Sequence, residues 1–157
     1  MRKLHFLIAM TGWSFIFHQS LAAQDQNTNS VLLYLELGGN AIFWSANIEA
    51  RFKSTEKLGW GFRLGAGGIG ETAAFIPLGV NYVFGKQSSP HHFVGGTGVT
   101  FLADFEENSG QLLGLFNFMY RFMPVHDGLT FHIGFTPYMD KRFNWRPWFG
   151  IGIGRSF

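Results

Sequence analysis

The chain has 157 residues, a formal net charge of +2, no cysteine, 14% charged residues and 18% aromatic residues. The lack of cysteine excludes disulfides and thiolate metal sites, and the lack of any basic run gives no indication of nucleic-acid binding. Soluble domains usually carry about a quarter charged residues, while the high apolar content argues against a disordered chain.

Residues 1–23 have the features of a secretory signal peptide. Two basic residues begin the segment, a mostly apolar stretch follows, and small residues precede a polar one. The apolar stretch is short for a spanning helix of about 20 residues, which makes an N-terminal membrane anchor the weaker alternative. We predict cleavage after Ala23, a short periplasmic tail over 24–30 and a barrel domain over 31–157. The chain without its leader has ten basic and ten acidic residues.

After the tail, apolar residues alternate with polar or small ones, which is the period of a β-strand. Each alternating segment is close to the about 9–11 residues that a tilted membrane-crossing strand needs. The segments are Val31–Gly38, Ala41–Phe52, Leu58–Gly68, Ala74–Gly85, His91–Leu102, Gln111–Phe122, Gly128–Pro137 and Pro147–Phe157. Turn-forming residues separate them, with a tight hairpin expected at Gly39-Asn40 and a loop over 138–146. The pattern predicts an all-β, eight-stranded antiparallel up-and-down barrel.

The two faces of the predicted strands differ in chemistry. One face is apolar and often aromatic, and the other is made of Gly, Asn, Ser, Thr, Arg and Glu. A soluble barrel points its apolar face inward, but here the apolar face is too bulky for a narrow interior and the glycine-rich face suits it. Aromatic residues gather near both strand ends, as in the girdles of membrane barrels. We therefore predict a transmembrane barrel with its apolar face in lipid, in preference to a secreted lipocalin-like barrel.

Several polar and charged residues fall on the face predicted to point inward. They are Glu36, Asn47, Glu49, Arg51, Arg63, Asn81, Asn117, Arg121 and His132. An eight-stranded barrel is just wide enough inside for side chains to fill it, so these residues are expected to plug the interior. If residues 53–57 form the turn, Glu49 becomes the diagonal neighbour of Arg63. We predict an interior ion pair between these two residues, with Glu36 as the substitute partner.

Three patterns could carry chemistry, and each has a simpler structural interpretation. Gly65–Gly70 matches G-x-G-x-x-G, but a second strand pattern follows it instead of a helix. The pair His91-His92 points to opposite faces of a strand. Ser45, Glu49 and His132 all face inward, but they match no hydrolase motif. No catalytic, cofactor-binding or metal-ligating residue is predicted.

The end of the chain carries a recognisable pattern. Alternate apolar residues lead to a terminal aromatic residue, at Phe149, Ile151, Ile153 and Phe157. This pattern resembles the C-terminal signature that the barrel assembly machinery reads in outer-membrane proteins, although Arg155 stands where an apolar residue is usual. The whole mature chain resembles the small OmpA/OmpX-like barrels in architecture. The resemblance implies a Gram-negative cell outer membrane, with outer-membrane lipid and the assembly machinery as partners.

The sequence predicts location and architecture better than activity. The first hypothesis is a non-enzymatic barrel with a structural or surface-interaction role. The second is an outer-membrane lipid-modifying hydrolase, which needs a reactive Ser/His pair near one membrane interface. The third is a narrow conduit for ions or small solutes, which needs a continuous water path past the interior charges.

Overall fold

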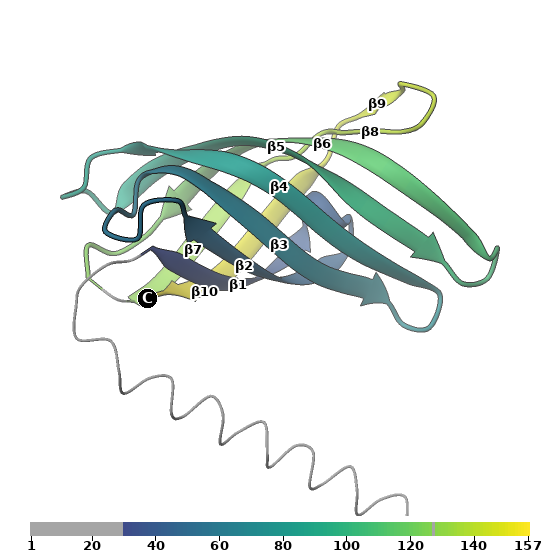
Figure 1. Ribbon diagram of the computed structural model, residues 1–157, viewed down its shortest axis with the longest axis horizontal. Coiled ribbons are helices and arrows are strands. Elements are labelled where there is room, and N and C mark those ends of the chain that lie inside the picture. Colours follow the sequence, from purple (N-terminus) through teal and green to yellow (C-terminus); the bar gives the residue numbers. More distant parts are fainter. Residues whose placement is uncertain (1–29, 127) are drawn as a thin grey trace, which may run out of the picture.

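The computed structural model of the protein describes residues 30–126 and 128–157. The predicted signal peptide and residues 24–29 of the predicted tail lie outside this part of the chain. Within it, eight long strands form a closed antiparallel barrel in which chain neighbours pair and β1 pairs with β10 (Figure 1). The strands are β1 Val31–Gly38, β2 Trp44–Arg51, β3 Gly59–Ile69, β4 Ala73–Gly85, β5 His91–Asp104, β6 Ser109–Phe122, β7 Gly128–Phe135 and β10 Phe149–Ser156. The predicted all-β eight-stranded antiparallel barrel is confirmed.

A two-stranded hairpin occupies much of the segment that was expected to be a loop. Strands β8 (Tyr138–Met139) and β9 (Trp145–Arg146) pair with each other, and β8 also pairs with β6. They continue the lines of β7 and β10 beyond Pro137 and Pro147. The two prolines interrupt these strands because proline cannot donate to a strand ladder. The hairpin extends past the barrel wall at the upper right of Figure 1.

The turn after β1 is wider than the tight hairpin predicted at Gly39-Asn40. A 3-10 turn, η1 (Gly39–Ala41), is followed by Ile42 with a φ of 69°, and the N–H of Gly38 donates to the oxygen of Phe43 at 2.5 Å. All three residues of η1 are buried. The turn therefore folds inward at the mouth of the barrel. This end is called the hairpin end here, and the opposite end, where residues 31 and 157 pair, is called the terminal end.

The turn between β2 and β3 also differs from the prediction. The N–H of Phe52 donates to the oxygen of Trp60 at 3.0 Å, so the turn is longer than residues 53–57. Glu49 consequently lies directly opposite Arg63 and not diagonal to it. Gly59 has a φ of 90°, which few residues other than glycine adopt, and this breaks the alternation. Leu58, which was expected on the outer face, instead packs against a buried apolar cluster at the terminal end.

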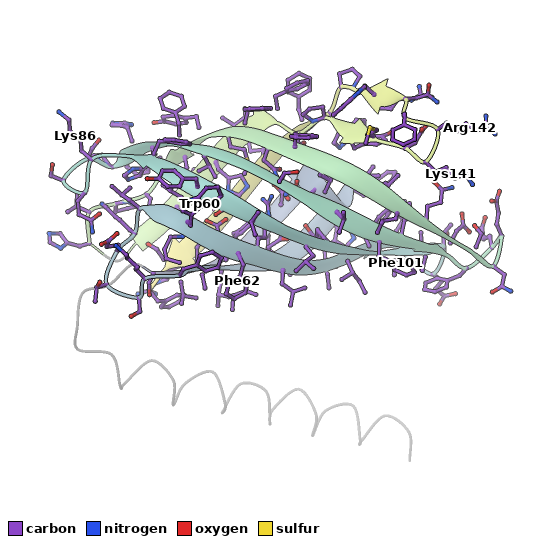
Figure 2. The ribbon with its side chains drawn as sticks, turned by 45° about the horizontal axis from the view of Figure 1, so that its top comes forward. Trp60, Phe62, Lys86, Phe101, Lys141 and Arg142 are labelled. Atoms are coloured by element: carbon purple, nitrogen blue, oxygen red, sulfur yellow. The ribbon has the colours of Figure 1, made fainter. Side chains whose placement is uncertain are left out.

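The outer face of the wall is apolar over its full circumference. Large hydrophobic side chains point away from the barrel on every strand, among them Trp60, Phe62 and Phe101, whereas Lys86, Lys141 and Arg142 lie at its two ends (Figure 2). The inner face instead carries the buried polar residues and several glycines. Among the described residues, no helix is long and apolar enough to cross a membrane.

The interior has a layered composition along the barrel axis. An apolar cluster of Ala41, Ala73 and Phe75 lies at the hairpin end, and another of Val83, Val94 and Met119 lies toward the terminal end. Buried polar side chains fill the region between them, and Lys57 and His92 are also buried at the terminal end. Because these side chains are buried, each of their charges needs a protein partner.

A substitution at Gly154 tests how tightly the neighbouring strands β1 and β10 pack. A methyl group added there would overlap the backbone oxygen of Leu33 and the Cβ of Tyr34, whereas one added at Gly95 would meet only the Phe84 ring, at 3.5 Å. We expect Gly154→Ala to lower the free energy of unfolding by about 1–3 kcal/mol, as overpacking does, and Gly95→Ala to change it much less. Urea unfolding of the refolded barrel measures both. Equal effects would contradict the packing at β1 and β10.

Candidate functional site

The centre of the polar interior is Glu49 on β2. Arg121 reaches it from β6 and donates from both terminal nitrogens, at 2.5 Å to Oε1 and 2.9 Å to Oε2. Arg51 donates to the same carboxylate from two residues along β2. The side chains of Glu49 and Arg121 are each 1% exposed. Bidentate, charge-assisted pairs of this kind are among the strongest hydrogen-bonded contacts in proteins, and this one joins strands that are not neighbours in the sheet.

Arg51 extends the network toward the terminal end. Its Nη1 donates to the oxygen of Gly59 at 2.8 Å, and its Nη2 donates to Oδ1 of Asn81 at 2.7 Å. These two bonds use further donors of the guanidinium besides the one that binds Glu49. Arg51 thus links strands β2, β3 and β4 from the inside.

Arg63 forms a second centre nearer the hairpin end. Its Nη1 donates to the hydroxyl of Tyr34 at 3.1 Å. With its side-chain oxygen turned toward Arg63, Asn40 of η1 accepts from the guanidinium and donates to Oδ1 of Asn117. Arg63 is 2% exposed, so these neutral acceptors, together with the nearby carboxylates, compensate for its burial.

Glu36 links the inward-folded turn to β7, which is separated from β1 only by β10. Its Oε1 lies 3.2 Å from Nε2 of His132 on β7, and its Oε2 accepts from the backbone N–H of Asn40 at 3.3 Å. The backbone oxygen of Asn40 in turn accepts from the hydroxyl of Thr100 at 2.6 Å. The ring of His132 also makes an edge contact with Tyr34, with the ring centroids 4.8 Å apart. The network therefore fixes η1 in the barrel mouth.

The structure places every predicted interior residue inside the barrel but gives the charges different partners. All nine are buried: Glu36, Asn47, Glu49, Arg51, Arg63, Asn81, Asn117, Arg121 and His132. In place of the predicted ion pair with Arg63, Glu49 pairs with Arg121 and Arg51. Directly across from Glu49, Arg63 donates to Tyr34. The prediction considered only residues on neighbouring strands, whereas Arg121 reaches Glu49 from across the barrel.

Sequence reasoning missed three residues of this network. Tyr34 lies between two outward leucines on β1, so the alternation already indicates that it points inward. Thr100 alternates in the same way with Val99 and Phe101 on β5. Asn40 carried no such signal, because it lies in a turn whose direction depends on the rest of the barrel.

The inward Ser45, Glu49 and His132 are not linked as a catalytic triad in the structure. The hydroxyl of Ser45 accepts from Asn47 at 2.8 Å, Glu49 binds arginines, and the ring of His132 meets Glu36. A hydrolase needs nucleophile and base within hydrogen-bond reach of each other. The described part of the chain also contains no group of three or more His, Asp and Glu positioned to hold a metal ion.

The terminal pattern occupies two different environments. Phe149, Ile151 and Ile153 point outward from β10. Phe157 completes the closure, because its N–H donates to the oxygen of Val31 at 2.8 Å and its oxygen accepts from the N–H of Val31 at 3.2 Å. The geometry thus gives Phe157 a backbone role at the seam between β1 and β10.

Comparison with known proteins adds no relative to this description. No protein-family model, no curated protein and no solved structure matches the chain. Functional inference therefore rests on the barrel, its two faces and the partners of its side chains.

The Glu49–Arg121 pair can be tested by removing one partner or both. We expect Glu49→Leu to lower the free energy of unfolding by about 3–5 kcal/mol, because it leaves Arg121 charged and unpaired in a buried site. The double variant Glu49→Leu/Arg121→Met should lose less than Glu49→Leu alone. Urea unfolding of the refolded barrel measures the differences.

Glu56 provides the matched control for this experiment. It pairs with Lys53 at 3.5 Å on an exposed turn, where an ion pair contributes about 0–1 kcal/mol. Glu56→Leu should therefore change stability little. If the double variant were at least as unstable as Glu49→Leu, the proposed dependence of Arg121 on this one carboxylate would be wrong.

Proposed function

We propose that the protein is an integral β-barrel of the Gram-negative cell outer membrane with a structural or surface-interaction role. It would be exported by a cleaved signal peptide and folded by the barrel assembly machinery. The observation that carries the proposal is the polarity of the barrel, with its charges inside and its large apolar side chains outside. This is the arrangement of membrane barrels and the reverse of most soluble ones.

The outward positions of the strands are poor in charge. Arg155 is the one Lys, Arg, Asp or Glu among the outward-facing positions of the eight described barrel strands. Apolar patches larger than a few hundred Å² are uncommon on soluble monomers, and here the apolar surface surrounds the molecule. Lipid around the wall would remove this surface from water.

Aromatic contacts near the terminal end support the same proposal. The ring of Tyr82 lies 5.3 Å from that of Trp60 and 4.5 Å from that of Phe84, between centroids. Farther along this rim, Phe93 packs on Tyr120 with centroids 6.2 Å apart. Outer-membrane barrels place such girdles at the membrane–water interface, where a ring can meet both apolar chains and water.

Two hairpins of opposite charge offer the contact surface for a surface-interaction role. Lys141, Arg142 and Arg146 lie on or beside the β8–β9 turn, where Phe143 is 77% exposed. Backbone N–H groups of Asn144 and Arg142 donate to Asp140, which lowers the pKa of that carboxyl and holds the turn in shape. The tip between β5 and β6 is instead acidic.

The acidic tip is ordered by its own side chain. Oδ1 of Asp104 accepts from the backbone N–H groups of Glu106 and Glu107, both at 3.0 Å. A partner that touches both hairpins would therefore meet one basic and one acidic patch, each of fixed shape. Such patches favour specificity and association rate over raw affinity.

An arginine on the outer wall tests the membrane location. Leu78 points outward from the middle of β4, and Leu37 points outward near the hairpin end of β1. In phospholipid vesicles, we expect Leu78→Arg to cost about 2–4 kcal/mol and Leu37→Arg about 0–1 kcal/mol, since the penalty depends on depth. Unfolding titrations of the vesicle-inserted barrel measure both. In a soluble barrel both changes would stay within about 0.5 kcal/mol, and that result would overturn the proposal.

Deletion of Phe157 tests the assembly role of the terminal pattern. We expect less folded barrel in the outer membrane, measured as the heat-modifiable band on a gel, because the signature and one pair of backbone bonds to Val31 are lost. Phe157→Ala keeps those backbone bonds and should still reduce assembly. Phe143→Ala, which removes an exposed phenylalanine from the β8–β9 hairpin, is the control. Normal folded yield from both Phe157 variants would contradict the assembly role.

A further inference from the structure

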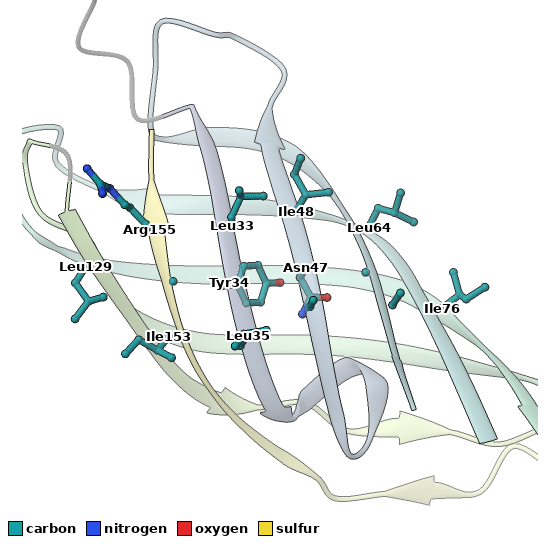
Figure 3. A pocket seen from close by; sticks show the side chains of 14 residues that line it. Leu33, Tyr34, Leu35, Asn47, Ile48, Leu64, Ile76, Leu129, Ile153 and Arg155 are labelled. Carbon is teal, nitrogen blue, oxygen red and sulfur yellow. The ribbon is translucent and has the colours of Figure 1, made fainter. Parts of the chain in front are cut away.

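The outer wall carries an apolar hollow of about 890 Å³ (Figure 3). Its floor contains two small residues that pair across strands, Ala46 on β2 and Ala66 on β3. Larger side chains stand around them, among them Leu35 on β1, Ile48 and Leu64. The hollow lies over these two alanines, whose side chains are smaller than the leucines and isoleucine around them.

Arg155 lies at the edge of this hollow. It pairs across the strands with Leu33 on β1 and Leu129 on β7, both of which line the hollow too. Its guanidinium lies 5.4 Å from the centroid of the Phe157 ring, toward the terminal end. The described residues include no carboxylate in an ion pair with it. Its charge is therefore available to a ligand.

The register connects Arg155 to the middle of the wall. Arg155 is one residue from the end of β10, whereas Leu64 is the sixth of eleven residues in β3. Leu33 and Ile48 form the row between them. Because the strands of such barrels tilt by about 35–45°, a row across them climbs from the terminal rim toward mid-height.

We infer that this hollow seats the acyl chains of an anionic phospholipid whose phosphate pairs with Arg155. The inference rests on the proposed membrane location. Guanidinium groups bind phosphate oxygens in a bidentate manner, and the volume lies within the range of about 300–1,000 Å³ typical of ligand sites. A chain that starts at the rim and reaches mid-height spans one leaflet, about half of a 30 Å hydrocarbon core. The apolar floor would then take the chain and the arginine the headgroup.

Native mass spectrometry of the full barrel, extracted from membranes into neutral detergent, tests the site. The probes are dioleoyl phosphatidylglycerol and dioleoyl phosphatidylcholine, which share their chains and differ in net charge. We expect the wild-type barrel to bind phosphatidylglycerol in preference, and Arg155→Gln to reduce that preference about tenfold. Ala46→Leu should weaken binding of both lipids because it fills the floor.

Arg142→Gln is the matched control, since Arg142 is an exposed arginine on the β8–β9 hairpin and outside the hollow. It should leave the preference unchanged. Equal binding of the two lipids by the wild-type barrel, or an equal loss from Arg142→Gln, would overturn the site. Unaltered lipid binding in Ala46→Leu would do the same. These outcomes leave the membrane location standing, because that is tested separately by the depth-dependent cost of Leu78→Arg.

Discussion

A barrel closed by eight strands has room inside for side chains and little else, and this width governs how the inward residues of the protein are used. Each charge that enters the interior lies within reach of the opposite wall. Arg121 can therefore bind Glu49 across the barrel, although β6 and β2 are not neighbours. Adjacent strands also pack closely, because a methyl group at the inward Gly154 of β10 would overlap the neighbouring strand β1.

The polar interior and the apolar exterior are both related to the closure of the sheet into a narrow barrel. Backbone groups in a closed sheet are satisfied by their neighbours, so the wall can face lipid without unpaired N–H or C=O groups. The charges then have to pair inside, where removing one partner is costly. Glu36 shows how far this extends, since it binds both His132 on β7, beyond the neighbouring strand β10, and the backbone of the inward turn at Asn40.

The two ends of the barrel differ in a way that bears on function. At the terminal end, the seam of the barrel closes between Val31 and Phe157. At the hairpin end, β5 and β6 run beyond the rest of the wall, and the β8–β9 hairpin adds a second projection with opposite charge (Figure 1). The surface interaction proposed above would use the hairpins, and the proposed lipid site would use the hollow beside Arg155.

The alternation of apolar and polar residues by itself determined the eight barrel strands and the face that most of their residues join, because side chains of a strand alternate between two faces. It missed the β8–β9 hairpin and placed Leu58 on the wrong face. That local rule was enough to place Glu49, Arg63 and Arg121 inside together. It was not enough to say which of them touch. The β2–β3 turn is longer than expected and shifts the register, and only the closed barrel brings Arg121 of β6 to Glu49. The inward fold of Asn40 and the hollow over Ala46 and Ala66 likewise depend on strands distant in sequence. Pairings of this kind arise from the curvature and stagger of the whole sheet, which no local pattern encodes.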